Sequence, residues 1–123
     1  MAAAQKKNMK KYLAVFLGTE AAMKRFEKLP LKTRRELEEK GMQAWGQWVK
    51  KNSKSIVDLG APLGTTKHVD RKGTRNASNQ LAAYTVVQAS SHAAAAKLFK
   101  NHPHFMIFPG DSVEIMECLP VPL

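Results

Sequence analysis

The feature that most restricts the fold of this chain is the order of its strand-like and helix-like segments. A two-faced apolar segment at residues 12–17 precedes two helical patterns, and a second apolar segment begins at Ile56. A third strand pattern at residues 81–89 precedes a capped, Ala-rich helix at residues 91–100 and a last strand at residues 113–119. Strand–helix–strand therefore occurs twice, which is typical of a ferredoxin-like α+β sandwich with one antiparallel sheet.

Two helices are expected between the first two strands. Thr19 has the position and the hydroxyl of a helix cap, and Pro30 ends the short helix that follows it. Thr33 and Glu36 have capping-box spacing, which predicts a second helix over residues 34–54. An apolar stripe runs along this helix: Leu37, Gly41, Ala44, Trp45, Trp48 and Val49. Its two tryptophans are either core residues or a pair that stacks on a ligand.

The first strand is apolar on both of its faces. Tyr12, Ala14 and Phe16 alternate with Leu13, Val15 and Leu17. Right-handed crossovers place every helix on one face of the sheet, so the other face needs a separate cover. A second copy of the same sheet provides that cover, and we therefore expect a homodimer that pairs as a dimeric α/β barrel.

Length and composition set further limits. The 123 residues are enough for one domain, expected over residues 10–123 behind a flexible N-terminal tail at residues 1–9. The single cysteine, Cys118, cannot form an internal disulfide, fits a cytoplasmic protein and is expected to be buried. No apolar run approaches the roughly 20 residues of a membrane span, so no membrane partner is expected.

The net charge of +10 is concentrated in the first half of the chain. Residues 1–54 hold 14 Lys and Arg against 5 acidic residues, whereas residues 55–123 hold 6 against 5. This excess indicates either a solvated helical face with a basic tail, or a module that binds nucleic acid or an acidic partner. Nucleic acid is not the expected partner, because no exposed-looking aromatic residues are interleaved with the basic ones.

A polar segment separates the second strand from the third long one. Residues 65–69 are predicted to form an edge strand, and residues 70–79, which are rich in turn formers, to form a loop. Four basic residues lie in this region: Lys67, Arg71, Lys72 and Arg75. They either reach an anion or belong to a mobile surface segment.

Two candidate site residues lie at a strand end and at a helix start. Asp58 is the only acid in the apolar run of residues 56–64, and a half-buried carboxylate there needs a partner or a raised pKa. It acts as an acid, base or ligand, or else it caps the turn that follows. His92 lies in the first turn of the last helix, where the helix dipole favours a neutral imidazole. It is either an acid–base group or an exposed helix-start residue.

Two more histidines flank a proline after that helix. His102 and His104 point the same way if the chain is extended around Pro103. Such a pair can bind a ligand, or a metal if Asp58 or His92 supplies a third group. No further Cys or His cluster supports a metal, so neither a metal nor another cofactor is expected. The other interpretation is a rigid turn whose rings cover the sheet edge.

Five ordered segments carry a further signal: VDLGAPLG (57–64), LAAYTVVQA (81–89), SHAAA (91–95), HP (102–103) and VEIME (113–117). Together they resemble the YCII-related family over roughly residues 10–120, which implies a ferredoxin-like fold paired as a dimeric α/β barrel. Members of that family are mostly uncharacterised, and for some a His–Asp pair in the first half of the chain has been suggested as catalytic. The first histidine here is His68, and His102-Pro103 replaces the family's Asp-Pro turn, so that pair is not carried over.

These observations predict a cytoplasmic homodimer that holds a small molecule in a cleft between the helix-bearing sheet and the partner subunit. Proton transfer is assigned to Asp58, His92 and His102, and ligand binding to Asp58, His102 and His104. Two alternatives stay open: a module that binds nucleic acid or an acidic partner through the basic N-terminal half, and a structural dimer without chemistry.

Overall fold

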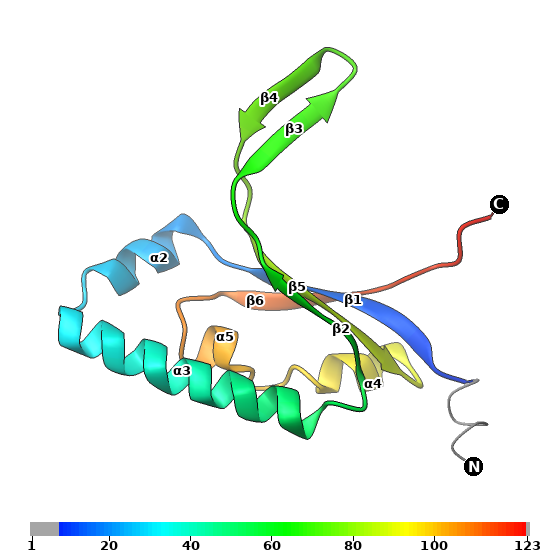
Figure 1. Cartoon of the computed structure of the whole chain (residues 1–123), viewed down its shortest axis with the longest axis horizontal. Helices are drawn as coiled ribbons and strands as arrows, with labels where there is room; N and C mark the ends of the chain where they lie inside the picture. Colours follow the sequence, from blue (N-terminus) through cyan, green and yellow to red (C-terminus); the bar gives the residue numbers. More distant parts are fainter. Residues whose placement is uncertain (1–7, 123) are drawn as a thin grey trace.

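The computed structural model describes residues 8–122, so residues 1–7, most of the predicted tail, lie outside the described part of the chain. Its elements, in chain order, are β1 (Lys10–Leu17), α2 (Glu20–Glu27), α3 (Leu31–Lys51), β2 (Ile56–Pro62), β3 (Thr66–Asp70), β4 (Gly73–Ala77), β5 (Leu81–Ala89), α4 (His92–Lys97), α5 (Pro103–Met106) and β6 (Ser112–Glu117). A four-stranded sheet has the order β2-β5-β1-β6, and its neighbouring strands are antiparallel (Figure 1). The predicted ferredoxin-like α+β sandwich is confirmed.

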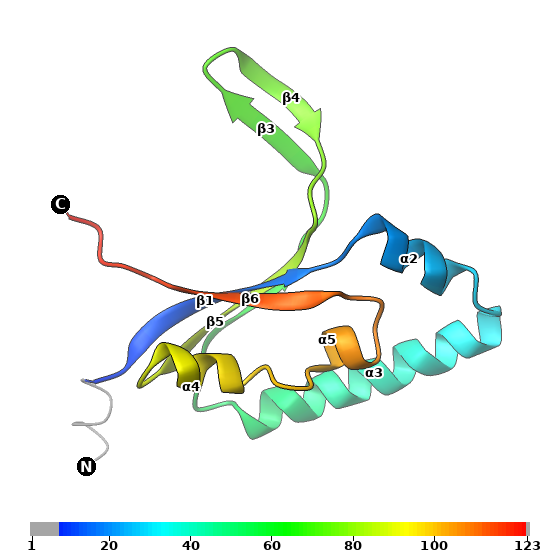
Figure 2. The same cartoon turned by 180° about the vertical axis from the view of Figure 1, so that it is seen from behind.

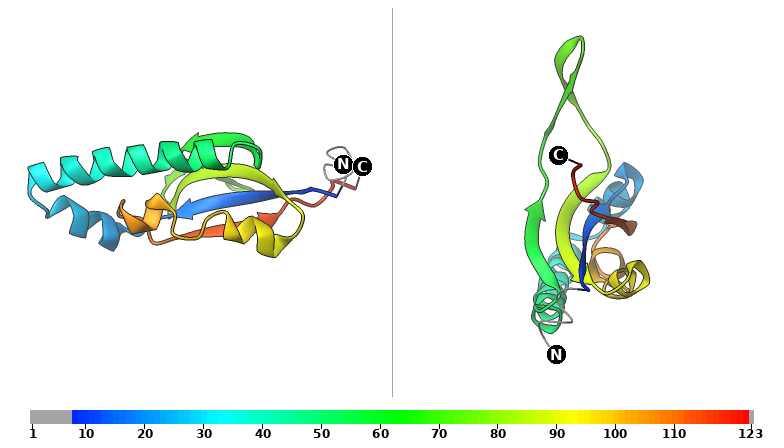
Figure 3. Two further views of the ribbon diagram at one scale, coloured as in Figure 1. Left: turned by 90° about the horizontal axis from the view of Figure 1, so that it is seen from below. Right: turned by 90° about the vertical axis from the view of Figure 1, so that its right-hand side faces the viewer.

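The helices α3, α4 and α5 lie on one side of this sheet (Figures 2 and 3). The β1 residues Tyr12, Ala14 and Phe16 are buried on that side. They form the hydrophobic core with residues from the helices and the neighbouring strands, among them Trp48 and Phe99. The core is therefore a single layer of side chains between the sheet and the helices, and it includes residues of the predicted α3 stripe.

The opposite side of the sheet carries the alternate residues of each strand and is called the helix-free face below. Pairing places Leu13 beside Val86 and Met116, and Val15 beside Tyr84 and Glu114. Apart from the charged Glu114, the centre of this face is apolar. No helix of residues 8–122 packs on it (Figure 3, right). The two-faced pattern of β1 thus corresponds to one side under the helices and one side without a helix, on which Val15 is buried while Leu13 and Leu17 are partly exposed.

The helix boundaries confirm the predicted caps of α2 and α4 and correct that of α3. The Ser91 hydroxyl caps α4, because it accepts a hydrogen bond from the backbone N–H of Ala94 at 3.0 Å. The Thr19 hydroxyl accepts a hydrogen bond from the backbone N–H of Ala22 at 3.2 Å, as a cap of α2 does. The helix α3, in contrast, begins at Leu31 after Pro30, which makes no side-chain cap, and it ends at Lys51. The capping box at Thr33 is therefore wrong, because proline already sets the backbone angle with which the helix starts.

The polar segment after β2 is a β-hairpin: the strand predicted at residues 65–69 is present as β3, but a second strand, β4, occupies part of the predicted loop. The strands β3 and β4 pair from Thr66–Ala77 to Asp70–Gly73 in a separate two-stranded sheet. Apart from Thr66, all residues of these two strands are exposed, so neither strand shows the apolar alternation that identifies a strand in a sequence. The prediction of a loop over residues 70–79 is therefore wrong.

Two further predictions concern the surface. Cys118 follows the end of β6 and is an exposed free thiol, so the expectation that it is buried is wrong. Within residues 8–122, no helix combines the length and the apolar character needed to cross a membrane.

Candidate functional site

The connection from α4 to β6 carries the two central histidines. His102 is the N-cap of α5, and Pro103 occupies the first turn of that helix. The Nδ1 atom of His102 accepts a hydrogen bond from the backbone N–H of His104 at 3.0 Å. The segment is helical rather than extended, so the two side chains are not the parallel pair that an extended chain would present.

His102 is fully buried in a cluster of aromatic rings. Its ring centroid lies 4.5 Å from that of Trp45, and the two ring planes are perpendicular. The centroids of Trp48, Phe16 and Phe99 lie 4.7, 5.1 and 5.8 Å away. These four rings and His102 are called the aromatic cluster below.

The hydrogen bonds of His102 identify its neutral tautomer. Because Nδ1 accepts a hydrogen bond, the proton of the neutral ring is on Nε2. That nitrogen is buried and has no hydrogen-bond partner among the described residues. The two tryptophan rings lie edge-to-face with the imidazole, so aromatic rings rather than polar groups surround it. Desolvation lowers the pKa of His102 to about 4, and the nearby His104 ring adds to the effect, so His102 is neutral at pH 7.

His104 connects α5 to the end of β1. Its Nε2 donates a hydrogen bond to the carbonyl of Leu17 at 2.8 Å. Desolvation lowers the pKa of His104, against the opposing effects of that carbonyl and of the Asp111 charge. Gly110 leaves room for the ring, because a Cβ at this position would lie 2.3 Å from Cε1 and Nε2 of His104. At pH 7 His104 is therefore a mostly neutral imidazole held in a defined position.

A cavity of about 420 Å³ lies between α3, the segment around α5, and the neighbouring ends of β2 and β5. Its lining is largely apolar and includes Met42, Trp45, Val49, Leu59, Ala83 and Phe108. His104 is the one imidazole of the lining, which contains no Asp, Glu, Lys or Arg. The hydroxyl of Thr85, also in the lining, donates to the carbonyl of Leu59 at 2.8 Å. The cavity thus combines apolar walls with a single titratable imidazole, an arrangement found in small-molecule sites.

The close approach of α3 to the segment around α5 depends on one glycine. A Cβ at Gly41 would lie 2.5 Å from the ring of Phe108, so only glycine lets that ring pack directly on the helix. The same Phe108 ring lies 6.0 Å from Trp45, and both residues line the cavity. The place of Gly41 in the apolar stripe of α3 indicates that another element packs against the helix there. The sequence does not show that the packing side chain is the ring of Phe108.

Of the four predicted site residues, His104 alone belongs to the cavity lining, and His102, Asp58 and His92 lie outside it. Asp58 is exposed, and its Oδ1 accepts a hydrogen bond from the backbone N–H of Gly60 at 2.9 Å, as in a side-chain-capped turn. His92 is exposed at the start of α4, where its Nε2 donates to the carbonyl of Ile115 at 2.7 Å and its ring stacks on Tyr12. The structure therefore brings His102 and His104 together and leaves Asp58 and His92 elsewhere.

The arrangement gives no support to a metal-bound interpretation of these residues. Across residues 8–122, no three His, Cys, Asp or Glu side chains are close enough together to hold a metal ion. The Nδ1 of His102 and the Nε2 of His104 are both engaged with backbone groups. The alternative in which Asp58 or His92 completes a metal site with these two histidines is therefore wrong.

Comparison with known proteins yields only structural similarity. No family model matches the chain, and no curated protein matches it either. A 5-chloro-2-hydroxyhydroquinone dehydrochlorinase from Burkholderia phenoliruptrix AC1100, solved with 2,5-dihydroxybenzoquinone, is similar in structure with a TM-score of 0.49 and 13% identity, over 85% of this chain and 89% of that one. A dimeric protein of unknown function and ferredoxin-like fold from Bacteroides fragilis NCTC 9343 has a TM-score of 0.36 and 10% identity, over 90% and 95% of the two chains.

Proposed function

We propose that this chain is a cytoplasmic, YCII-related homodimer that binds a small, largely apolar molecule in the cavity between α3 and the sheet. The observation that carries the proposal is the pairing of an apolar lining with one imidazole, that of His104. Burial of apolar ligand surface favours binding, and one imidazole orients a single polar group of the ligand. The free thiol of Cys118 and the resemblance described above agree with the proposed location and family.

His104 is the residue that meets the polar group of the ligand in this proposal. In its neutral form one ring nitrogen donates to the Leu17 carbonyl, and the other is an acceptor. The lowered pKa keeps the His104 imidazole neutral at pH 7, so its free nitrogen is an acceptor for a ligand hydroxyl and a general base, although a weaker one than an exposed histidine. His102 acts as a positioning residue, since its Nδ1 holds the backbone of His104 from inside the core.

The proposal is tested with the two indole N–H signals of the 15N-labelled chain, which Trp48→Phe assigns. Trp45 lines the cavity and Trp48 does not, so the second indole is an internal control. Phenol is the probe, and benzene is the matched compound without a polar group. Phenol is expected to shift the Trp45 signal at lower concentration than benzene does, and His104→Gln to remove that difference. His92→Gln, which changes a histidine outside the cavity, should preserve it. If phenol shifts neither indole, or both equally, the cavity is not the binding site.

A further inference from the structure

The β3–β4 hairpin extends away from the rest of the chain. It continues from the ends of β2 and β5 and projects on the side opposite the helices (Figures 1 and 3). Its strand residues are exposed except for Thr66, and Val69 retains 72% of its accessible surface. A protruding, solvent-exposed hairpin of two strands is marginally stable by itself in water.

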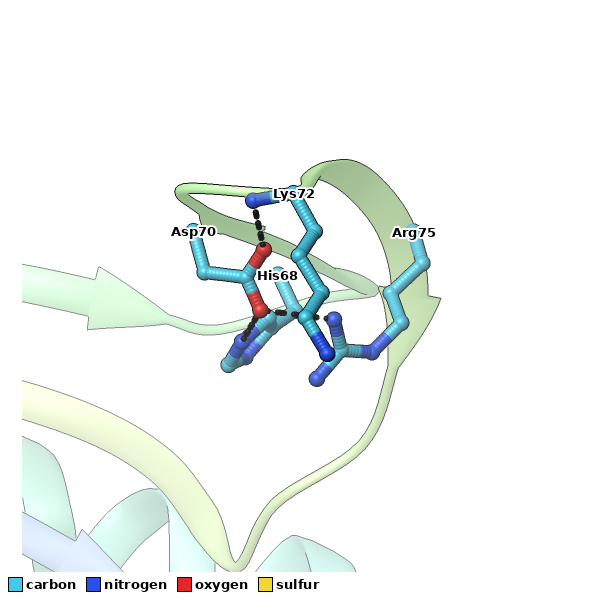
Figure 4. A network of polar contacts seen from close by, with 4 residues as sticks. All are labelled: His68, Asp70, Lys72 and Arg75. Carbon is cyan, nitrogen blue, oxygen red and sulfur yellow. Dashed lines mark hydrogen bonds and ion pairs between the residues drawn. The ribbon is translucent and has the colours of Figure 1, made fainter.

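The hairpin is nevertheless internally organised around Asp70 at its tip. The Asp70 carboxylate accepts hydrogen bonds from the backbone N–H of Lys72 at 2.9 Å and from Arg75 Nη1 at 2.8 Å, and it contacts His68 Nε2 at 3.2 Å (Figure 4). Lys67 and Asn76 form a further side-chain pair across the two strands. These contacts pre-shape the hairpin, which lowers the entropy lost when it docks on a partner.

The helix-free face lies at the base of the hairpin, so a hairpin from a second copy could dock beside it. Its centre is formed by Leu13, Val15, Val86 and Met116, with the exposed carboxylate of Glu114 on the edge strand β6. Residues 66–77 contain four Lys or Arg and one Asp, so the hairpin is basic. A two-fold dimer through the helix-free faces would therefore bring a basic arm of each copy toward an acidic edge of the other.

We propose that the β3–β4 hairpin is a dimerisation arm that docks on a second copy of this chain beside its helix-free face. This inference rests on the proposed homodimer. In a two-fold dimer each copy contributes one arm to its partner and contacts the arm of its partner in turn. Nucleic acid fits the arm less well, because residues 66–77 contain no Phe, Tyr or Trp on which bases stack and Asp70 already engages Arg75.

The test combines sedimentation with limited proteolysis of the full chain. Trypsin cleaves after Arg71 and Lys72 at the hairpin tip, and both residues are exposed in the single chain. We expect cleavage there to slow as the protein concentration rises through the monomer–dimer transition. Arg71→Glu/Lys72→Glu is expected to raise the dimer Kd about tenfold or more. Lys32→Glu/Arg35→Glu, on the exposed surface of α3, changes the charge equally and should leave the dimer Kd within about twofold.

Three results would overturn the inference, and they are distinguishable. The chain could dimerise while trypsin cleaves the hairpin at the same rate at every concentration and Arg71→Glu/Lys72→Glu leaves the dimer Kd unchanged. That result would reject the dimerisation arm and retain the homodimer. If the chain is monomeric at all concentrations, both the proposed homodimer and the dimerisation arm are rejected. Binding of a 20-nucleotide RNA that the hairpin variant alone abolishes, with an unchanged dimer Kd, would instead make the hairpin a polyanion site.

Discussion

His102 and His68 show how far the surroundings of one residue type can differ within this chain. His102 is fully buried among aromatic rings, and its one protonated nitrogen has no hydrogen-bond partner among the described residues. His68 lies at the exposed hairpin tip and contacts the carboxylate of Asp70 at 3.2 Å. In the first setting burial lowers the pKa of the His102 ring and keeps it neutral, whereas in the second the ring lies on the surface beside a carboxylate. The four histidines are therefore not interchangeable as site candidates, and burial separates them before any chemistry does.

The largest expected effect is the loss of the buried ring. His102→Ala removes the contacts to the aromatic cluster and the cap of α5, and it leaves a cavity in the core. We expect the free energy of unfolding to fall by about 3 to 5 kcal/mol. The matched change His68→Ala should alter it by no more than about 0.5 kcal/mol. Urea denaturation measures both, and equal losses would contradict the contrast between the two environments.

The second effect is acid destabilisation. The pKa of His102 is about 4 in the folded state and about 6.5 in the unfolded state, so between these values the unfolded chain binds more protons. Stability is therefore complete above about pH 6.5 and is lost as the pH falls toward 4, by up to about 3 kcal/mol. Denaturation at several pH values measures this. The slope should shrink in His102→Gln and persist in His68→Gln, and an unchanged slope in His102→Gln would assign it to other groups.

A smaller effect separates the two tryptophans of α3. Trp48 donates its Nε1–H to the carbonyl of Leu98 at 2.7 Å, joining α3 to the end of α4. Trp48→Phe removes this buried hydrogen bond and leaves the carbonyl without its partner, at an expected cost of about 1 to 3 kcal/mol. Trp45→Phe should change stability less but weaken phenol binding, since Trp45 lines the cavity. If the Trp48 variant also loses phenol affinity, the two roles are not separate.

The smallest expected effect concerns the hairpin tip. Asp70→Asn removes the carboxylate whose pKa is lowered chiefly by Arg75 and by the backbone N–H of Lys72. Because the tip is exposed, we expect no measurable change in the global free energy of unfolding. The amides of β3 and β4 should nevertheless exchange hydrogen faster, which hydrogen exchange at low protein concentration detects. An unchanged exchange rate would mean that the hairpin does not depend on the Asp70 contacts.

Much of the fold follows from local patterns and could be predicted. The alternation in β1, the hydroxyl of Thr19 and the 3.6-residue stripe containing Trp48 depend on neighbours within a few positions. The strand and helix order then leaves few topologies, because crossovers have one hand. The strand β4 has no such signal, because both of its faces meet solvent and its sequence lacks the periodicity that identifies strands.

The candidate site depended on contacts that no local pattern contains. Phe108 packs on Gly41 across a separation of 67 positions, and the ring of His104 bonds to Leu17 across 87. These approaches bring Phe108 and His104 into the cavity lining, and His102 is buried by rings that are likewise distant in the sequence, those of Phe16, Trp45 and Trp48. The amino-acid sequence alone therefore determined the elements and the two-sided sheet, since these depend on short-range periodicity. The tertiary structure decided which histidine lines the cavity, because burial and the pKa depend on which distant side chains exclude water.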